Sequence, residues 1–453
     1  MFFLITIILI SITRRKIIEK RLQPRQRLGF KGYFCSMKHL TLAVALLFLP
    51  LFTAMGRPAA GGKAEAYGQL AGSVADSLER KYASAEVGLL TCGPGDQLYT
   101  LYGHTAIHYR DSAAGEDVVL NYGIFSFSQE HLALKFMMGK IDYSVQLLPF
   151  RHFVEEYRAE GRWVAEHKLD LTGVEKARVR EGFAIACRPE NRTYRYNIFY
   201  NNCSTKARDL LDSCFSSPRI ERNRGAIAQT TFREMVAQNC VGHPWAMFGN
   251  DLLLGLYADT LVSTVPNSQF LPDSLRKSFG NSYLDTGQPG RGIVRPLVKS
   301  TEWIVPPLEK TGKAGFPTPF TAMVLFGLVA AAVCAAEWKT RKAFRSFDAV
   351  CYWISGLAGL LIAAMAFSEH PTVNLNLQIL LLNPAALIPA FNLTFRQKRY
   401  KREFTHATVS GIFATLFLIG GFFQHYAEGM ATLALILLLR IVWRTARKTQ
   451  SNR

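Results

Sequence analysis

The 453-residue sequence lacks the motifs that build most metal and nucleotide sites. It contains no Cys-x-x-Cys pair, no His-Glu-x-x-His, no acidic cluster with ligand spacing and no Gly-Lys-Ser/Thr phosphate loop. It also has no internal repeat and no low-complexity block. We therefore expect no bound metal, no nucleotide and no cofactor.

Acidic residues are few, since 34 Asp and Glu against 53 Lys and Arg give a formal charge of +19. Residues 1–36 carry +7 and residues 320–453 carry +9, which leaves only about +3 for residues 37–319. A nucleic-acid-binding protein would concentrate the excess on its folded soluble part. We therefore expect no nucleic-acid partner. The basic residues lie beside apolar segments, where such charges determine membrane topology.

Two connections in the C-terminal third contain no Lys or Arg at all. They alternate with basic connections between apolar stretches, several of which approach the ~20 residues that cross a bilayer. The stretches are residues 320–336, 349–368, 375–395, 405–424 and 427–443. Basic residues follow the first, third and fifth stretches, as the positive-inside rule requires for five spans. The pattern places residues before Phe320 outside the cytoplasm and the C-terminus inside.

The N-terminus contains two separate apolar runs. Met37-Lys38-His39, an apolar core and then small residues are typical of a secretory signal, so residues 37–60 are predicted to be a signal peptide or an anchor. Residues 1–36 contain an apolar run and then a dense basic stretch. They are interpreted either as an extension from a misassigned start site or as an extra N-terminal anchor. Both interpretations export the sequence that follows.

The exported region, residues 67–300, mixes strand and helix periodicities and is predicted to be an α+β domain. Alternation and turn signals predict strands over residues 86–91, 104–110 and 118–122, the last two as an antiparallel hairpin. Capping and apolar spacing predict helices over residues 172–187 and 203–214. Residues 301–319 are predicted to be a linker, 320–443 an all-α transmembrane domain of about five helices, and 444–453 a basic cytoplasmic tail.

The exported region holds an odd number of cysteines, namely Cys92, Cys187, Cys203, Cys214 and Cys240. In an oxidising compartment an odd number leaves at least one thiol free or paired with another chain. The count allows two disulfides and one reactive thiol, with the pairing left open.

Cys203 follows Asn201-Asn202, which is typical of a helix N-cap, so it lies in the first turn of a predicted helix. Exposed N–H groups and the positive end of the helix dipole favour a thiolate there. The same N–H groups could hold the oxyanion of a tetrahedral acyl intermediate. The alternatives are a buried structural cysteine or a disulfide partner of Cys187 or Cys214.

His104 lies on the first strand of the predicted hairpin and is the candidate base. If Arg110 pairs with Asp117, Ala106 faces Asn121, and Asn121 becomes a diagonal neighbour of His104 on the same face. An amide there would fix the imidazole tautomer and complete a thiol–imidazole–amide relay. A register slip of one residue would turn Asn121 away. The alternatives are a structural histidine and a turn asparagine.

Other residues compete for these roles or extend them. His108 is an alternative base, and Cys92 is a rival nucleophile for which a core or disulfide role is favoured. Arg158 and Arg162 are candidates for holding a lipid phosphate, with a solvated helix face as the favoured alternative.

Two further residues lie next to the proposed reactive pair, and one polar group lies near the membrane. Asn202 and Tyr102 adjoin the nucleophile and the base in the sequence and complete the candidate binding residues. The polar group, His370, Asn374, Asn376 and Asn383, lies near the outer ends of the second and third spans. It is interpreted as either functional or helix-capping.

The order of the site residues resembles that of circularly permuted papain-like thiol enzymes of the NlpC/P60 type, a group that includes lecithin–retinol acyltransferase-like proteins. Four segments look more closely like the Bacteroides-type lipoprotein N-acyltransferase family: residues 90–96 (LTCGPGD), 101–106 (LYGHTA), 121–125 (NYGIF) and 196–205 (YNIFYNNCST). Members of that family join such an exported domain to a multi-span domain. The resemblance implies a permuted papain-like fold and a bacterial inner-membrane location with a periplasmic catalytic domain.

The resemblance also implies a reaction. His104 would deprotonate Cys203, which would attack an acyl ester of a phospholipid and form a thioester. The N-terminal amine of a diacylated lipoprotein would then accept the acyl chain. The first alternative is a membrane-anchored cysteine peptidase or amidase that acts on cell-wall peptides with water as acceptor, and the second is a non-enzymatic membrane scaffold. Five spans, where one anchor would suffice, favour the acyltransferase.

Overall fold

The computed structural model describes residues 72–451, apart from 126–129, 216–219, 223–229, 286–293, 309–316 and 397–402. The chain divides into a first unit that ends at Ala83 and a second that runs from Ser84 to Arg453. Of the first unit, residues 72–83 are described, and residues 72–81 form a helix. The predicted extension 1–36 and signal peptide or anchor 37–60 lie outside the described residues. All that follows concerns the second unit.

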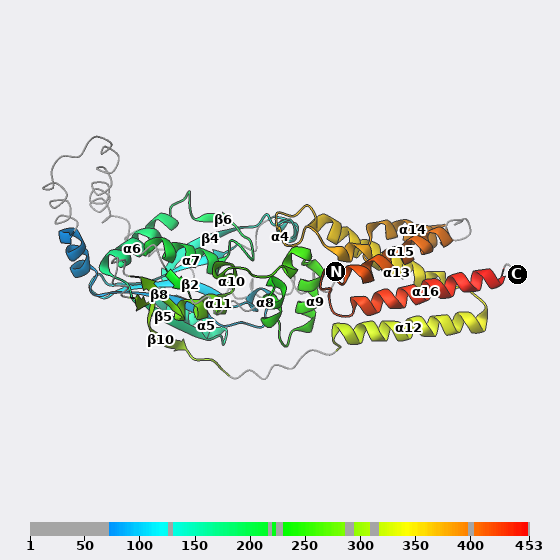
Figure 1. The fold of residues 1–453 in the computed structure, drawn as a ribbon, viewed down its shortest axis with the longest axis horizontal. Coiled ribbons are helices and arrows are strands. Elements are labelled where there is room, and N and C mark those ends of the chain that lie inside the picture. Colours follow the sequence, from blue (N-terminus) through cyan, green and yellow to red (C-terminus); the bar gives the residue numbers. More distant parts are fainter. Residues whose placement is uncertain are drawn as a thin grey trace, which may run out of the picture. The chain divides into compact units, whose positions relative to one another are not determined.

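A seven-stranded antiparallel sheet is the frame of the exported part (Figure 1). The strand order is β10-β5-β1-β2-β3-β4-β6. The strands are β1 (Ala85–Cys92), β2 (His104–Asp111), β3 (Glu116–Ile124), β4 (Asp142–Pro149), β5 (Val164–Leu169), β6 (Thr193–Arg195) and β10 (Val298–Val305). A second sheet has the order β7 (Ile220–Arg222), β8 (Ser282–Asp285) and β9 (Val294–Pro296). The predicted strands are β1, β2 and β3, and the predicted hairpin is confirmed.

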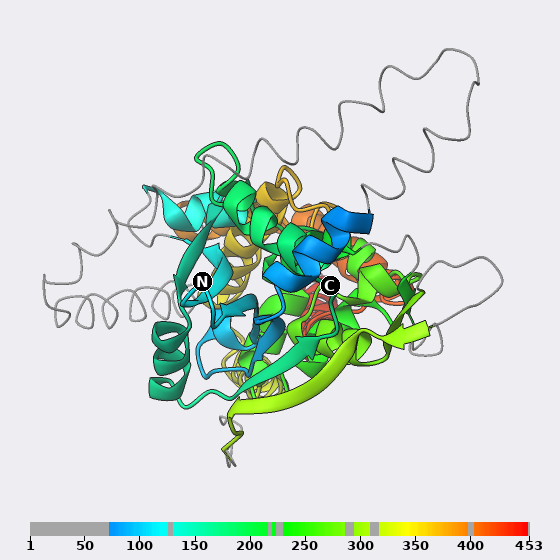
Figure 2. The ribbon, with the colours of Figure 1, turned by 90° about the vertical axis from the view of Figure 1, so that its left-hand side faces the viewer.

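Helices cover both faces of the large sheet, which explains why β2 is buried along most of its length. Helix α5 (Phe150–Ala159) packs its buried Phe153 on the face that carries Ala106. Helices α6 (Gly173–Ala186) and α7 (Cys203–Cys214) contact the sheet through β1, β2 and β3. Figure 2 shows the same layers from the end, with β10 as the long light-green strand at the edge.

The starts of α6 and α7 follow from their capping residues. Thr172 Oγ1 accepts the N–H of Glu175 at 3.2 Å, and the Glu175 carboxylate accepts the N–H of Thr172 at 2.9 Å. Asn202 caps α7 in the same reciprocal manner with Thr205. Both helices have the predicted bounds to within one residue, so these two predictions are confirmed.

One part of the predicted domain organisation is wrong. Residues 301–305, assigned to the linker 301–319, belong to β10, which pairs with β5. Lys168 and Glu302 join the two strands by an ion pair of 2.9 Å. The strand is flanked by Pro296 and Pro306. Proline is tolerated at the ends and edges of strands, so these residues are compatible with a strand between them. The connector to the membrane helices therefore begins only after Val305.

Between β7 and β8 in the sequence lies a group of short helices with its own aromatic core. They are α8 (Phe232–Gln238), α9 (Pro244–Leu253), η6 (Leu256–Asp259), α10 (Val265–Ser268) and α11 (Pro272–Gly280). Phe199, Phe232 and Phe270 pack together at its centre. Arg233 is buried here and binds Asp251 at 3.0 Å and Asp259 at 2.7 Å.

The C-terminal third is helical and apolar. Its elements are α12 (Pro319–Thr340), α13 (Arg345–Met365), η7 (Leu377–Leu380), η8 (Pro384–Ala386), α14 (Leu387–Phe395), α15 (Glu403–Gly420) and α16 (Met430–Ser451). Among the described residues of this part, three segments are long and apolar enough to cross a membrane, and α15 is a shorter apolar helix. The third segment is broken into η7, η8 and α14, as expected from Pro384. Helix α16 continues to Ser451, so the predicted tail 444–453 is helical over most of its length.

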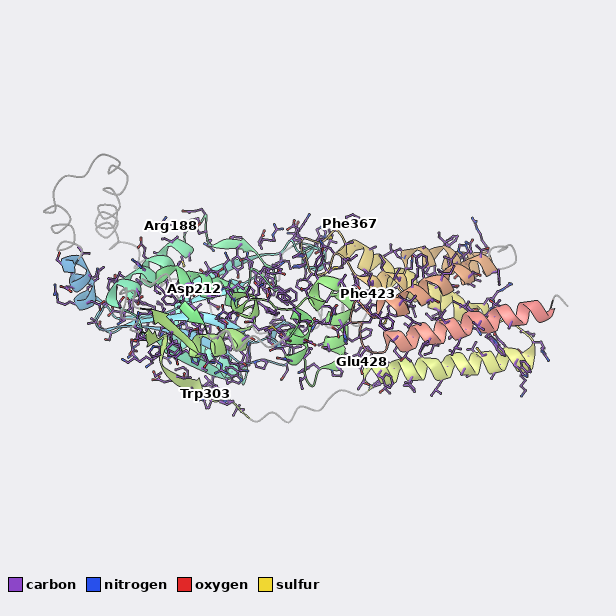
Figure 3. All side chains as sticks on the ribbon, viewed as in Figure 1. Arg188, Asp212, Trp303, Phe367, Phe423 and Glu428 are labelled. Carbon is purple, nitrogen blue, oxygen red and sulfur yellow. The ribbon has the colours of Figure 1, made fainter. Side chains whose placement is uncertain are left out.

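The exported part is bound directly to the helical part along a polar seam. Amide side chains of the two loops that lack Lys and Arg donate to the last backbone carbonyls of α9. Asn376 donates to Leu252 at 2.9 Å, Gln378 to Asp251 at 2.8 Å and Gln424 to Leu254 at 3.3 Å. Figure 3 shows Phe367, Phe423 and Glu428, which flank these loops, at the same ends of the helices. Asn376 and Asn383 also cap η7 and η8, which confirms the capping interpretation for these two residues.

Candidate active site

Cys203 is the first residue of α7, and Asn202 fixes its position. Asn202 Oδ1 accepts the N–H groups of Ser204 at 2.9 Å and Thr205 at 3.0 Å. Its amide donates to the carbonyls of Ile198 at 2.6 Å and Phe270 at 2.8 Å. All polar atoms of this buried side chain are therefore engaged within the protein. The geometry favours a positioning role for Asn202 over the predicted ligand contact.

This cap reduces the number of N–H groups in the first turn of α7 that could bind an oxyanion. Because Asn202 occupies the N–H groups of Ser204 and Thr205, neither is available to an oxyanion. The N–H of Cys203 itself has no acceptor recorded among the residues that the structure describes. It therefore becomes the candidate oxyanion donor of the first turn.

His104 and Asn121 lie side by side as the predicted register requires. Arg110 pairs with Asp117 in the β2–β3 ladder, which brings Ala106 opposite Asn121. His104 Nε2 and Asn121 Oδ1 are 2.6 Å apart. Because an amide oxygen only accepts, Nε2 carries a proton, and Nδ1 is left to face another partner.

The thiol of Cys203 is that partner. Burial alone would raise the pKa of Cys203, but the charge and hydrogen bond of His104, with further bonds from the Thr105 backbone and Ser204, lower it below its usual value. Burial likewise opposes protonation of His104, but Cys203 and then Asn121 raise the pKa of His104. Opposite shifts of this kind favour a thiolate–imidazolium pair.

The rival residues are held in other environments. Burial raises the pKa of Cys92 far above its usual value. It also raises the pKa of Cys187 and of Cys240, and it raises the pKa of Cys214 to about 11. No cysteine in the described part of the chain is disulfide-bonded, so neither of the two disulfides that the count allowed forms there. Cys203 is thus the one exported thiol whose surroundings favour the thiolate.

His108, the alternative base, is engaged elsewhere. Its Nδ1 lies 2.6 Å from Glu166 Oε1 and its Nε2 lies 2.8 Å from Asp117 Oδ1. Both ring nitrogens are therefore occupied by carboxylates. This arrangement favours a structural role for His108.

The remaining predicted binding residues lie in different surroundings. Arg158 is exposed in the last turn of α5, as its alternative interpretation stated. Arg162 is buried, donates to the Gly93 carbonyl at 2.8 Å and lies 4.6 Å above the Tyr157 ring. Tyr102 accepts a hydrogen bond of 2.6 Å from Asn250. Arg162 and Tyr102 thus brace the surroundings of the site.

Several residues of the site escaped the sequence reading. The Tyr157 ring lies nearly parallel to His104 with centroids 6.4 Å apart, and Thr105 Oγ1 bonds to Ser204 Oγ at 2.9 Å. Gly123, in the NYGIF segment, forms a bulge against β4 and lies beside both His104 and Cys203. The resemblance of the NYGIF segment already pointed to Gly123, whereas no pattern in the sequence indicated Tyr157.

Two family profiles match the chain. The Lnb N-terminal periplasmic domain matches residues 76–238, and the Lnb transmembrane domain matches residues 311–452. Together the two matches cover about two thirds of the sequence. The chain belongs to the Lnb family. No curated protein and no solved structure matches it.

Membership explains the main architecture. An Lnb chain has a periplasmic domain and a transmembrane domain, so the sheet-rich part is periplasmic and the protein resides in the inner membrane. The predicted fold class, an α+β domain followed by a helical membrane domain, is confirmed. The relay residues lie within the matched Lnb periplasmic domain, whereas α9, which forms the seam, lies between the two matched regions. Because no solved structure matches, the permuted papain-like relationship stays a prediction.

Proposed function

We propose that this Lnb protein is a lipoprotein N-acyltransferase, which moves an acyl chain from a phospholipid through a Cys203 thioester to the N-terminal amine of a diacylated lipoprotein. The observation that carries the proposal is the geometry of the pair: Cys203 opens the capped helix α7, and the neighbouring His104 is oriented by Asn121 at 2.6 Å. His104 also lowers the pKa of Cys203, whereas burial raises the pKa of the other exported thiols. The seam supports it further, because it fixes the domain that carries this thiol to the membrane helices. Lipid esters are the acyl donors that such a location offers.

The first half-reaction uses the pair as found. The Cys203 thiolate attacks the ester carbonyl of the phospholipid, and the oxyanion accepts a hydrogen bond from the N–H of Cys203. His104 gives its proton to the glycerol oxygen as the C–O bond breaks. The products are the Cys203 thioester and a lysophospholipid.

The second half-reaction reverses these proton transfers. The free amine of the lipoprotein attacks the thioester carbonyl, and neutral His104 takes the proton from that amine. The C–S bond breaks and restores the thiolate beside an imidazolium. Asn121 keeps Nε2 protonated throughout, so that Nδ1 always faces the reacting atoms. The product is an amide-linked acyl chain on a triacylated lipoprotein.

The full topology is part of the proposal. The basic connections after the first and third apolar segments and the basic end of α16 support a cytoplasmic C-terminus. The loops that form the seam carry no Lys or Arg and then lie on the periplasmic side. A cysteine accessible to membrane-impermeant reagents near residue 451 in intact cells would contradict this orientation.

The test is Cys203→Ala in cells that have no other N-acyltransferase, with mass spectrometry of lipoprotein N-termini. We expect triacylated lipoproteins to disappear, while the matched control Cys187→Ala, a half-buried thiol outside the site, keeps them. Purified wild-type protein in phospholipid vesicles should carry a hydroxylamine-sensitive acyl group on Cys203. Cell-wall peptide cleavage without such an adduct would instead support the peptidase.

A further inference from the structure

Helix α4 (Leu132–Met137) binds the loop that follows the membrane segment α13. Ser368 Oγ donates to the Met137 carbonyl at 2.8 Å, and the Glu369 N–H donates to the Met138 carbonyl at 3.0 Å. These bonds are separate from the polar seam, which binds α9. The periplasmic domain is therefore joined to the membrane helices at a second place.

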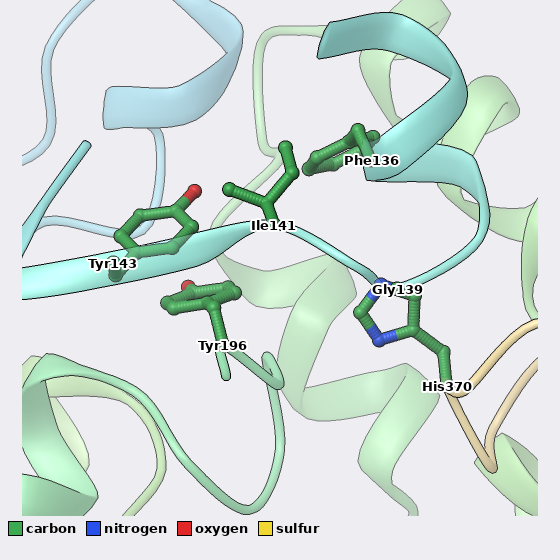
Figure 4. Close-up of a pocket in the computed structure, with 6 residues that line it drawn as sticks. All are labelled: Phe136, Gly139, Ile141, Tyr143, Tyr196 and His370. Carbon is green, nitrogen blue, oxygen red and sulfur yellow. The ribbon is translucent and has the colours of Figure 1, made fainter. Parts of the chain in front are cut away.

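Gly139 permits the close approach of the two segments at this joint. Its φ of +68° is a conformation that other residues rarely adopt, and a Cβ there would lie 3.1 Å from the His370 backbone nitrogen. Figure 4 shows the His370 ring beside this turn, with Phe136 and Ile141 near it. Side chains of both domains line the small space between them, namely Phe136, Ile141, Tyr143, Tyr196 and His370. Helix α4 and the loop thus form one packed contact.

The joint is also connected to the sheet that carries the candidate site. Arg195 on β6 binds Glu369 at 2.6 Å and Asp142 on β4 at 2.8 Å. Strand β4 follows α4 directly and pairs with β3, where Gln146 lies opposite Asn121. The position of α4 therefore determines the position of this edge of the sheet.

The joint lies close to the periplasmic end of a membrane span. Helix α13 is long and apolar enough to cross a membrane and ends at Met365, three residues before Ser368. This end is the periplasmic one, because the loop that follows it is bound to the periplasmic domain. Three residues of extended chain reach at most about 10 Å, so the contact with α4 lies within about that distance of the span.

Helix α4 exposes large apolar side chains at this depth. Leu134 is 56% exposed and Phe136 is 54% exposed, and Phe367 in the adjoining loop is 79% exposed. Phe422 and Phe423, in the loop after α15, are exposed as well. A surface that faces water rarely collects such side chains, whereas a surface that meets acyl chains favours them.

A tryptophan marks the same boundary at another span. Trp245, in the first turn of α9, is exposed, and its indole N–H donates to the Pro317 carbonyl at 2.7 Å. Pro317 lies two residues before the start of α12, which is also long and apolar enough to cross a membrane. Tryptophan is enriched at membrane–water interfaces, because its ring is apolar while its N–H needs a polar partner. Two elements of the periplasmic domain, α4 and α9, thus reach the ends of two spans.

Lys135 lies between the two exposed apolar residues, in the last turn of α4. This combination is typical of helices that lie in a membrane interface, where a lysine reaches the phosphates and its apolar neighbours contact acyl chains. A protein partner could also cover an apolar surface. The position of α4 beside the end of α13 favours lipid, because lipid surrounds the spans at this depth.

We propose that α4 is an interfacial anchor: Leu134 and Phe136 lie among the acyl chains of the outer leaflet of the inner membrane, and Lys135 lies at the level of the lipid phosphates. Phe367 and Phe423 lie at the same ends of the helices (Figure 3) and extend this contact. The inference rests on Lnb membership and does not depend on the acyltransferase reaction. The bilayer then sets the height of β4, and with it the height of the sheet edge that carries Asn121.

The test is photo-crosslinking of the full chain in vesicles of phosphatidylethanolamine and phosphatidylglycerol. Two phosphatidylethanolamine probes carry a diazirine in one acyl chain, either near the glycerol or near the methyl end. We expect residues 132–138 to be labelled mainly by the first probe, because interfacial helices lie about 5–10 Å into the headgroup boundary. The middle of α13 should be labelled mainly by the second. The peptide that contains Trp303, which is 51% exposed on β10, should carry no label.

The double variant Leu134→Glu, Phe136→Glu tests the two side chains themselves. Both positions are exposed, and the contacts of α4 with Ser368 and Glu369 use its backbone carbonyls, so the fold should remain intact. Labelling of residues 132–138 should fall about tenfold or more, since burial of either side chain shifts an equilibrium by about that factor. Labelling of α13 should stay, which shows that the spans remain inserted. The matched control Trp303→Glu should change neither.

Several outcomes would overturn the anchor. They are an unlabelled α4 beside a labelled α13, equal labelling of α4 and the Trp303 peptide, and undiminished labelling of the folded double variant. Cys203→Ala should be labelled as strongly as the wild type; labelling that is lost in this variant would report turnover of the probe instead of membrane contact. In cells, a photo-reactive phenylalanine at position 136 should capture phospholipid. Capture of a protein there instead would show that α4 binds a protein partner.

Discussion

The proposed nucleophile is a half-buried thiol whose ionisation depends on its neighbours. His104 supplies a positive charge and a hydrogen bond, and the Thr105 backbone and Ser204 add further bonds. An ordinary cysteine has a pKa near 8.5, and a paired one can ionise several units lower. Nucleophilicity at neutral pH is thus a property of the group around Cys203, and each neighbour can be tested by replacing it.

Alkylation should reveal the ionisation of Cys203. Because its pKa is lowered, the thiolate persists as pH falls below about 8.5 and reacts with iodoacetamide there, losing reactivity only at the lower pKa. His104→Ala should move the midpoint of the alkylation-rate profile to higher pH, since burial then raises the pKa of Cys203 without the opposing effect of His104. Peptide mass spectrometry after timed alkylation measures this, with Cys187 as an internal reference. An unchanged midpoint in His104→Ala would contradict the inferred thiolate–imidazolium pair.

In the proposed mechanism Asn121 orients the base and does not react, so its loss should lower activity less than the loss of His104. His104→Ala should lower kcat/KM for acyl transfer by roughly 10²–10⁴-fold, the range for general acid–base groups. Asn121→Ala should cost less than that, and its pH profile should shift because the bond that raises the pKa of His104 is lost. Thioester formation from labelled phospholipid measures both variants. Equal losses with unshifted profiles would contradict an orienting role.

The sequence predicts this constellation because its determinants are local. A two-residue alternation and one hairpin register place His104 and Asn121 on one face, and a capping pattern places Cys203 in a first helical turn. Tyr157 comes from a separate element, helix α5, and only tertiary packing brings it beside His104. The seam has the same origin, since no local pattern pairs a loop near residue 376 with the end of a helix near residue 253.

At the scale of elements, a polar cluster around the buried His108 ties three strands together. His108 on β2 binds Asp117 on the neighbouring β3 and also Glu166 on β5, although β1 lies between β2 and β5. Gly88 of β1 permits this, because a Cβ there would occupy the position of the Glu166 carboxylate. The Phe150 ring stacks on His108 with centroids 4.0 Å apart.

This cluster should make stability depend on pH. Burial opposes protonation of His108, but Glu166 and then Asp117 raise its pKa. A histidine whose pKa is raised in the folded state stabilises the fold fully when the pH is below its unfolded-state pKa of about 6.5. That stabilisation is lost as the pH rises through the folded-state pKa. His108→Gln should therefore cost ~3 kcal/mol near pH 5.5 and progressively less at higher pH. Thermal unfolding in detergent from pH 5.5 to 9 tests this, with exposed His152→Gln as control; a loss that grows with pH would refute it.

The predicted elements differ in how well local signals define them. Helices α6 and α7 follow capping boxes, so their bounds were predicted closely. Strand β10 lies in a proline-rich segment that indicates a connector, and only its pairing with β5 makes it a strand. The third apolar segment contains the prolines that break it, but the sequence alone does not fix where η7, η8 and α14 begin.

At the scale of the whole molecule, the seam makes the periplasmic domain and the membrane helices interdependent. Carbonyls at the end of α9 have no partners within their own helix, as at every helix end. Side chains of Asn376, Gln378 and Gln424 satisfy them. In return, the N–H groups of Gly255 and Leu256 donate to the carbonyls of Thr372 and Leu375 at 2.8 Å and 2.7 Å.

Hydrogen exchange can test this interdependence in the full chain. Asn376→Ala combined with Gln378→Ala leaves buried carbonyls unsatisfied, at about 1–3 kcal/mol for each. We expect faster exchange in the peptide that contains Gly255 and Leu256 and a lower apparent Tm. Asn191→Ala removes an exposed amide that donates only to Ile185, and it should leave that peptide unchanged. Equal exchange in the double variant and the wild type would show that the seam contributes no stability.

The position of α9 in the chain has a consequence for biogenesis. The ribosome makes residues 244–253 well before residues 376–424, so the end of α9 emerges in the periplasm while its capping amides are still unsynthesised. Until the later segments have been inserted, water is left to satisfy these carbonyls. We therefore expect the periplasmic domain to reach its final packing only after membrane insertion, and a chain stalled before residue 376 to leave this end of α9 exposed.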